Sequence, residues 1–147
     1  MIGIVVSGHI NFATGMQSAF KAIAGEQAQF QFVDFLESMS TDDLEAELRR
    51  AAQEVNTGDG VLFLCDVVGG SPCNRAMSIM LDTPNVEIIA GVNLAMVANA
   101  AFERDGSNLD DLVETIQEIG ASTMKSMRQE IAKLTATTSA VIEDDGL

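Results

Sequence analysis

The chain has 147 residues and a formal net charge of −14, with 22 Asp and Glu against 8 Lys and Arg. Its length predicts one domain with a substantial hydrophobic core. The negative charge argues against binding to nucleic acid or anionic lipid, and it favours encounter with a basic protein surface.

The amino-terminal part of the chain predicts two strand–helix pairs. An apolar run over residues 2–7 predicts a strand, and the apolar stripe that follows at helical spacing predicts a helix ending at Gly25. Residues 30–35 predict the second strand. Ser40 or Thr41 is suited to cap the second helix, because a hydroxyl oxygen accepts a bond from the first free amides of a helix.

The central part repeats this alternation. Residues 61–66 predict a third strand, and Ser71 before Pro72 predicts the N-cap and first turn of a third helix. Residues 86–91 predict a fourth strand, and residues 93–104 a fourth helix. Strands that alternate with helices indicate an α/β protein with a mainly parallel sheet, covered on both faces.

The carboxyl-terminal part is more ambiguous. A last long helix is expected, interrupted at Gly120. Residues 135–147 then predict a polar connector followed, at residues 140–143, by a short antiparallel edge strand. This stretch is either a frayed tail or an edge strand that joins its own sheet or, by domain swapping, that of a second subunit in a dimer. The chain is therefore divided into a domain of residues 1–134 and a carboxyl-terminal segment of residues 135–147.

The cysteines and the amino terminus indicate the compartment. Cys65 and Cys73 are too few for a secreted disulfide framework, and no histidine lies near them at a zinc-site spacing. We expect both to pack in the core. The chain starts without a basic leader, and no apolar run reaches the roughly 18 to 20 residues of a membrane span. The sequence predicts a soluble cytoplasmic protein without a metal site.

His9 is the only histidine in the sequence, and it follows the first predicted strand. Asp66 ends the third. If the strand order is 2-1-3-4, these strands are neighbours about 4.8 Å apart, and the crevice at their carboxyl ends is where ligands bind in open α/β sheets. A carboxylate that accepts the Nδ1 proton fixes the tautomer and leaves Nε2 free. The pair therefore predicts a nucleophilic His9 oriented by Asp66.

The turn Gly69-Gly70-Ser71 lies next to this pair in the predicted fold. Its amides and the Ser71 hydroxyl can bind phosphate oxygens at the amino terminus of the third helix. His9, Asp66 and this turn together predict a phosphohistidine site that requires no metal or nucleotide cofactor. Each also has a plainer interpretation: a surface histidine, a carboxylate that caps a turn, and a tight turn with a good N-cap.

Three sequence blocks carry a family resemblance: Ile-Val-Val-Ser-Gly-His at residues 4–9, Gly-Val-Leu-Phe-Leu-Cys-Asp-Val-Val-Gly-Gly-Ser-Pro-Cys-Asn at residues 60–74, and Ile-Ala-Gly-Val-Asn-Leu-Ala-Met at residues 89–96. Together they resemble the IIA component of the mannose family of the bacterial sugar phosphotransferase system. The resemblance covers roughly residues 1–128.

The resemblance implies a flavodoxin-like three-layer sandwich that forms a homodimer. It also implies a phosphotransferase component in which His9 accepts a phosphoryl group on Nε2 from the phosphocarrier HPr, with Asp66 orienting the ring. The group then passes to a IIB component and drives sugar uptake through a IIC/IID permease, the indirect link to the membrane. Family members often have glycine after this histidine, whereas this chain has Ile10.

Two alternatives stay open at this point. The chain could be the phosphoryl-donor subunit of a dihydroxyacetone kinase, which uses the same chemistry. It could also be a non-catalytic flavodoxin-like regulatory module whose crevice binds a metabolite. Genes for IIB, IIC and IID components beside this one would argue against the first alternative. A chain that takes up no acid-labile phosphate but is stabilised by a ligand would favour the second.

Overall fold

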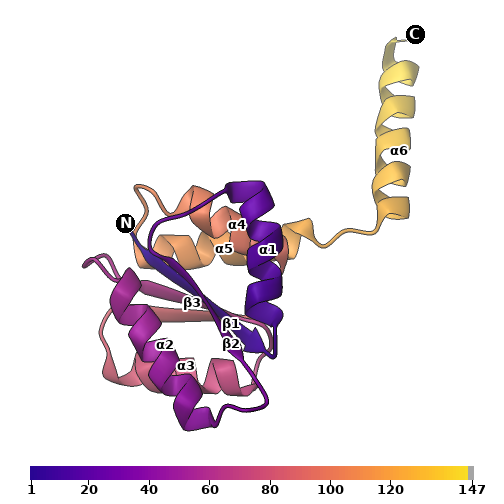
Figure 1. The fold of residues 1–147 in the computed structure, drawn as a ribbon. Helices are drawn as coiled ribbons and strands as arrows, with labels where there is room; N and C mark the ends of the chain where they lie inside the picture. The colour runs from indigo at the N-terminus through magenta and orange to yellow at the C-terminus, as the bar shows by residue number, and fades with distance from the viewer. Residues whose placement is uncertain (146–147) are drawn as a thin grey trace.

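The computed structural model describes the backbone of residues 1–145 and the side-chain surroundings of residues 1–137. Within this part of the chain, four strands form one parallel sheet in the order β2-β1-β3-β4 (Figure 1). The strands are β1 (Gly3–His9), β2 (Phe30–Phe35), β3 (Val61–Cys65) and β4 (Val86–Ala90). The predicted strand order is confirmed.

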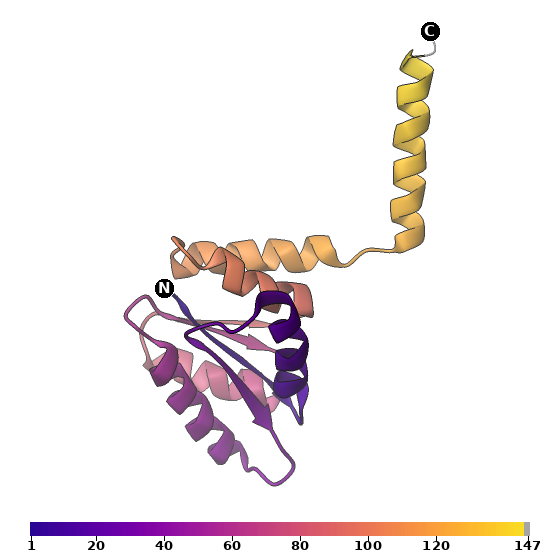
Figure 2. The ribbon, with the colours of Figure 1, turned by 45° about the horizontal axis from the view of Figure 1, so that its top comes forward.

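Helices cover both faces of this sheet. One face packs against α1 (Phe12–Ala24), α4 (Leu94–Glu103) and α5 (Leu109–Thr123), and the other against α2 (Thr41–Val55) and α3 (Ser71–Asp82) (Figures 1 and 2). Successive strand residues point to opposite faces, so Ile4 and Val6 join the first core and Val5 the second. This is the flavodoxin-like three-layer architecture that the sequence predicted.

The helix starts show which polar residues act as caps. Ser40 caps α2, because its hydroxyl oxygen accepts from the Asp43 amide and the Asp43 carboxylate accepts from the Ser40 amide, both at 3.0 Å. The predicted N-cap of α3, Ser71, lies one residue after the observed one. Gly70, in an extended conformation, is the N-cap, and Ser71 already belongs to the helix.

Arg104 holds the amino-terminal edge of the sheet together. Its side chain is 1% exposed, and its guanidinium donates to the backbone oxygens of Ile2, Ala28 and Gln29. It also lies 5.4 Å from the centre of the Phe30 ring. Burial lowers the pKa of Arg104, since removal from water disfavours its charged form. The end of α4 is thereby fixed to the starts of β1 and β2.

Gly120 does not interrupt the last helix as predicted. Helix α5 runs through it to Thr123, and the break lies at residues 124–126. Packing explains the glycine, because a Cβ at this position would lie 2.7 Å from the sulfur of Met96. Gly120 thus permits close contact between α5 and α4.

The expected strand at residues 140–143 is wrong, because these residues belong to helix α6 (Met127–Asp145). Ala132, Ala136 and Ala140 recur every fourth residue, and no glycine or proline occurs from 121 to 145, so helix propensity prevails over the few β-branched residues. This segment therefore offers no strand for subunit exchange. Helix α6 stands away from the three-layer body (Figures 1 and 2). Among the described helices, none is both long and apolar enough to cross a bilayer.

Candidate functional site

The structure brings His9 and Asp66 together at the carboxyl edge of the sheet. Ser7 pairs with Cys65 in the β1–β3 register, so the residues that follow on the two neighbouring strands leave the sheet side by side. His9 Nδ1 lies 2.7 Å from Asp66 Oδ2, and the His9 backbone N–H donates to the same oxygen at 2.9 Å. The carboxylate thus fixes both the ring and the backbone of His9.

The surroundings of Asp66 favour the ionised form of its carboxyl. Partial burial raises the pKa of its carboxyl, but hydrogen bonds from the backbone and ring of His9 and from the Val67 N–H outweigh this and lower the pKa below its ordinary value. The Asp66 side chain is 12% exposed, whereas that of His9 is 47% exposed. The acid is therefore sheltered and the imidazole accessible.

This contact determines which ring nitrogen of His9 is available. An ionised carboxylate accepts hydrogen bonds, so in the neutral ring Nδ1 carries the proton and Nε2 keeps its lone pair. Among the described residues, no hydrogen bond is made to Nε2. The arrangement can present Nε2 as a nucleophile, and Asp66 can balance the positive charge that the ring gains on reaction.

The turn Gly69-Gly70-Ser71 lies against the His9 ring. A Cβ at Gly70 would lie 2.6 Å from His9 Cε1 and 3.4 Å from Nε2, so a glycine is needed for the ring to pack this closely. Gly69 has φ +81°, a conformation that favours glycine. Gly70 thus lies against the nucleophilic edge of His9, and Gly69 and Ser71 adjoin it in the same turn.

The polar groups of this turn lie at the start of α3. Within residues 1–137, the backbone N–H groups of Gly69, Gly70 and Ser71 and the Ser71 hydroxyl donate no hydrogen bond, while the Gly69 carbonyl accepts from the Asn74 amide group at 3.1 Å. They lie at the amino terminus of α3, where the helix dipole favours an anion. The turn can therefore bind the oxygens of a phosphoryl group.

Asp34 is a supporting residue that the sequence analysis missed. It lies near the end of β2, and its carboxylate accepts from the Thr14 backbone N–H at 2.9 Å, the Thr14 hydroxyl at 2.7 Å and the Asn11 amide at 3.1 Å. These bonds fix the loop that follows His9, and the start of α1, to the end of β2. The signal that pointed to it was a charged residue near the end of residues 30–35, a run in which Gln31 is the only other polar residue.

Cys65 and Cys73 are both buried and free, as the prediction of core packing required. Burial raises the pKa of the Cys65 thiol, and the neighbouring Cys73 and Asp66 raise it further. A thiol held neutral is a poor nucleophile, because the thiolate is the reactive form. Cys65 is therefore a weaker candidate nucleophile than His9 at this edge.

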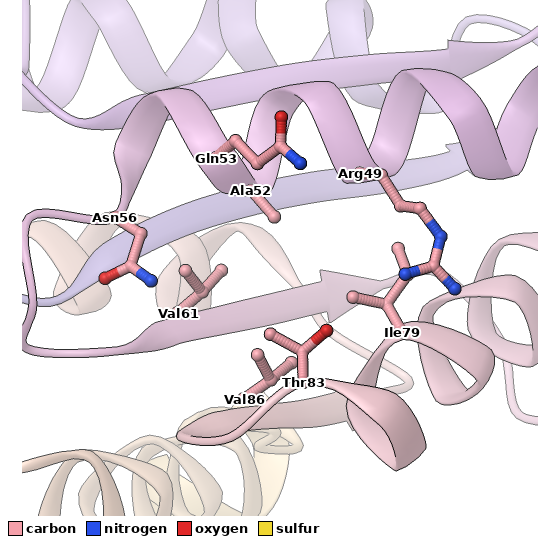
Figure 3. A pocket seen from close by; sticks show the side chains of 8 residues that line it. All are labelled: Arg49, Ala52, Gln53, Asn56, Val61, Ile79, Thr83 and Val86. Atoms are coloured by element: carbon pink, nitrogen blue, oxygen red, sulfur yellow. The ribbon is translucent and has the colours of Figure 1, made fainter.

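Two hollows lie away from His9. A cavity of about 80 Å³ lies between α2 and α3 towards the amino edge of the sheet, with Arg49 at its rim (Figure 3). Both guanidinium NH2 groups of Arg49 bind the Asp82 carboxylate, at 3.0 and 2.8 Å. An open hollow of about 600 Å³ lies beside β4 and α5. Neither is lined by His9 or Asp66.

Comparison with known proteins places the chain in a family. The profile of the EIIA-man family, described as "PTS system fructose IIA component", matches residues 3–117. The chain belongs to this family. It is a IIA component of the mannose family of the phosphotransferase system, and hence a phosphotransferase component.

Individual relatives agree with this assignment. The chain is 32% identical over 128 residues to the mannose-specific EIIAB component of the PTS from Escherichia coli K12, with 86% of this chain and 40% of that protein covered. It therefore spans less than half of that relative. It is 25% identical to the fructose-specific EIIA component of Bacillus subtilis over 99% of each chain.

Solved structures show the same fold. The EIIA component of Streptococcus agalactiae superposes with a TM-score of 0.82 at 26% identity, covering 88% of this chain and 99% of that one. The mannose/sorbose-specific IIA subunit of Enterococcus faecalis superposes with a TM-score of 0.76 at 29% identity, covering 84% and 92%. This IIA chain thus shares its fold with solved structures of PTS IIA components.

Proposed function

We propose that this IIA chain carries a phosphoryl group on Nε2 of His9, accepts it from phospho-HPr and passes it to a IIB component during sugar uptake. The observation that supports this most directly is the 2.7 Å contact between His9 Nδ1 and the sheltered Asp66 carboxylate. It leaves Nε2 as the free nitrogen on an accessible ring.

The transfer is an in-line displacement between two imidazoles. The Nε2 lone pair of His9 forms a new P–N bond while the P–N bond of the donor histidine breaks, and its electron pair returns to the donor ring. The His9 ring becomes cationic, and the adjacent Asp66 carboxylate stabilises it. The Ser71 hydroxyl and the amides of Gly69 and Gly70 bind the oxygens of the phosphoryl group.

The bond that breaks and the bond that forms are both P–N bonds to imidazole, so the free energy change of the transfer is small. The protein chiefly supplies position and electrostatics. Transfer from His9 to a histidine of the IIB component repeats the same exchange with His9 as the leaving group. The net charge of −14 attracts a basic-faced HPr and speeds encounter, an effect that salt weakens.

The unit that performs this transfer is proposed to be residues 1–134, acting as a homodimer, with residues 135–147 as a carboxyl-terminal segment. The boundary between the two lies inside helix α6 (Met127–Asp145), so continuous helix joins them. An apolar stripe on α6 supports the dimer: Met127, Ile131 and Leu134, spaced for one helix face, are 64%, 65% and 69% exposed. Contact with a second subunit would remove this surface from water.

The test is phosphorylation by phosphoenolpyruvate, enzyme I and HPr, followed by a chase with the IIB component. The wild-type chain should gain one acid-labile phosphate and lose it to IIB. His9→Gln, checked for native unfolding in urea, should gain none. Label that survives in His9→Gln would reject His9 as acceptor, and no label in the wild type would favour the regulatory module. Label that IIB cannot remove would reject the acceptor half of the proposal.

A further inference from the structure

Asn74 makes two contacts with the turn that lies against His9. Its side-chain amide donates to the Gly69 carbonyl at 3.1 Å, and its backbone N–H donates to the Gly70 carbonyl at 2.9 Å. The second contact is the first backbone bond of helix α3, whereas the first contact is made by the side chain alone. One residue therefore anchors the carbonyls of two successive peptides.

These two bonds determine where the amides of the turn point. The C=O and N–H groups of a trans peptide point in opposite directions, and no described peptide bond is cis. Because the Gly69 carbonyl faces the Asn74 side chain, the Gly70 N–H of the same peptide points away from it. The Gly70 carbonyl faces the Asn74 backbone, so the Ser71 N–H points away as well. Two successive N–H groups left free in this way can bind one anion.

Little besides Asn74 resists rotation of the peptide between Gly69 and Gly70. Neither residue has a Cβ, and glycine adopts positive and negative φ with similar ease, so this peptide can rotate at small cost. A rotated peptide would turn the Gly69 carbonyl oxygen to the side that the Gly70 N–H now faces, and that oxygen would repel a phosphoryl oxygen. The bond from the Asn74 side chain opposes this rotation, because it is made only when the Gly69 carbonyl faces α3.

The peptide that Asn74 holds lies next to the reactive nitrogen. A Cβ on Gly70 would lie 3.4 Å from His9 Nε2, so the Gly70 backbone adjoins the atom proposed to carry the phosphoryl group. Asn74 itself is exposed, and among the described residues it makes no hydrogen bond to His9 or Asp66. Any effect of its side chain on transfer must therefore pass through the turn.

We propose that Asn74 is a positioning residue for phosphoryl transfer. Its side chain holds the Gly69-Gly70 peptide so that the Gly70 N–H donates to an oxygen of the phosphoryl group on His9. The inference rests on the proposed function and names the residue that orients one of its donors. The Ser71 N–H does not depend on this side chain, because the backbone bond from Asn74 to the Gly70 carbonyl forms with any residue but proline at position 74.

Asn74→Ala removes the side-chain bond and keeps the backbone bond. The kcat for transfer from phospho-HPr should fall about tenfold while KM stays within about twofold, as expected for an interaction made mainly in the transition state. Amide NMR spectra of the chain, kept phosphorylated by phosphoenolpyruvate, enzyme I and HPr, supply a second readout. Phosphorylation should shift the Gly70 amide strongly in the wild type and much less in Asn74→Ala, whereas the Ser71 amide should shift in both.

Asn99→Ala is the matched control. Asn99 lies in α4, on the opposite face of the sheet from α3, and its side-chain amide likewise donates to a backbone carbonyl, that of Ala95 at 2.8 Å. Its loss should leave kcat and the Gly70 shift at their wild-type values. The urea midpoint of both alanine variants should stay near that of the wild type, because alanine raises helix propensity where a hydrogen bond is lost. Asn74→Asp keeps the size of the side chain but has no N–H to donate, and it should lose the Gly70 shift in the same way.

The outcomes distinguish this inference from the proposed function. If Asn74→Ala keeps the wild-type kcat and Gly70 shift, the positioning role is overturned while the proposed function stands. Loss of the Gly70 and Ser71 shifts together would also overturn it, because the whole start of α3 would then have rearranged. A rise in KM alone, or a wild-type Gly70 amide that does not respond to phosphorylation, would overturn it as well. If the wild-type chain takes no phosphate from phospho-HPr, both the inference and the proposed function are overturned.

Discussion

Gly70→Ala tests whether close packing of the turn against His9 sets the reactive geometry. Gly70 has φ −76° and ψ 164°, which alanine adopts without strain. The added Cβ would lie 2.6 Å from His9 Cε1, whereas ordinary contacts begin at 3.4 Å. If the ring alone yields, it must move by the difference, about 0.8 Å. A displacement of this size is large relative to the 2.7 Å bond to Asp66.

The expected result is a loss of transfer without a loss of fold. Misplacement of a reacting group by about 1 Å costs on the order of 100-fold in rate, so kcat for transfer from phospho-HPr should fall about 10- to 100-fold. The free energy of unfolding should change by less than about 1 kcal/mol, because alanine also reduces the entropy of the unfolded chain. Rapid-quench phosphorylation and urea unfolding measure the two quantities.

Gly58→Ala is the control for stability. Gly58 lies in the turn between α2 and β3, at the opposite edge of the sheet from His9, and has φ +111° with open space around it. Alanine there should cost about 1–3 kcal/mol through backbone strain and leave transfer unchanged. A folded Gly70→Ala variant that transfers phosphate at the wild-type rate would refute the reasoning about ring position.

Two further predictions concern Asp66 and Arg104. Asp66→Asn should slow transfer about 10- to 100-fold, because the ring loses its charged orienting partner. Since the pKa of Asp66 is lowered in the folded protein, its ionised form stabilises the fold at pH above the unfolded-state value of about 4, and this contribution disappears as the pH falls through the folded-state value. The stability gap between wild type and Asp66→Asn, measured in urea, should therefore narrow on acidification; a widening gap would contradict the assignment. Arg104→Met should lose roughly 3 kcal/mol of stability, because buried backbone oxygens lose their donor, yet transfer at the wild-type rate. Slower transfer by a folded Arg104→Met protein would show that the two edges of the sheet are coupled.

Much of this site followed from the sequence because it depends on strand ends. Apolar runs place His9 and Asp66 at the carboxyl ends of β1 and β3, and the strand order 2-1-3-4 makes those strands neighbours. With this strand order, the His9 and Asp66 side chains follow adjacent strands at the same edge of the sheet and therefore come into contact. The role of Gly70 in close packing against His9 was not predicted, because a glycine before a helix is equally typical of a turn.

Other features depend on tertiary context that local sequence does not encode. The left-handed conformation of Ile10 results from its bridge to Phe35 on another strand. Residues 140–143 were misread because the adjacent β-branched residues Val141 and Ile142 follow a polar stretch and resemble a short edge strand, although the surrounding alanine spacing favours a helix. Gly120 was misread because its role is contact with Met96.

The amino edge of the sheet stabilises the fold, whereas the carboxyl edge carries the candidate site. This division explains why backbone strain occurs at the carboxyl edge. At the amino edge, Arg104 is buried and bonded to three backbone oxygens, an arrangement that stabilises the fold. At the carboxyl edge, a non-glycine residue is held at positive φ, apolar side chains stay in water and helix amides stay unpaired among the described residues. In the transfer complex that we propose, a partner would cover the exposed apolar side chains and a phosphoryl group would accept bonds from the helix amides. The left-handed backbone of Ile10 is held by its bridge to Phe35 and would stay as it is.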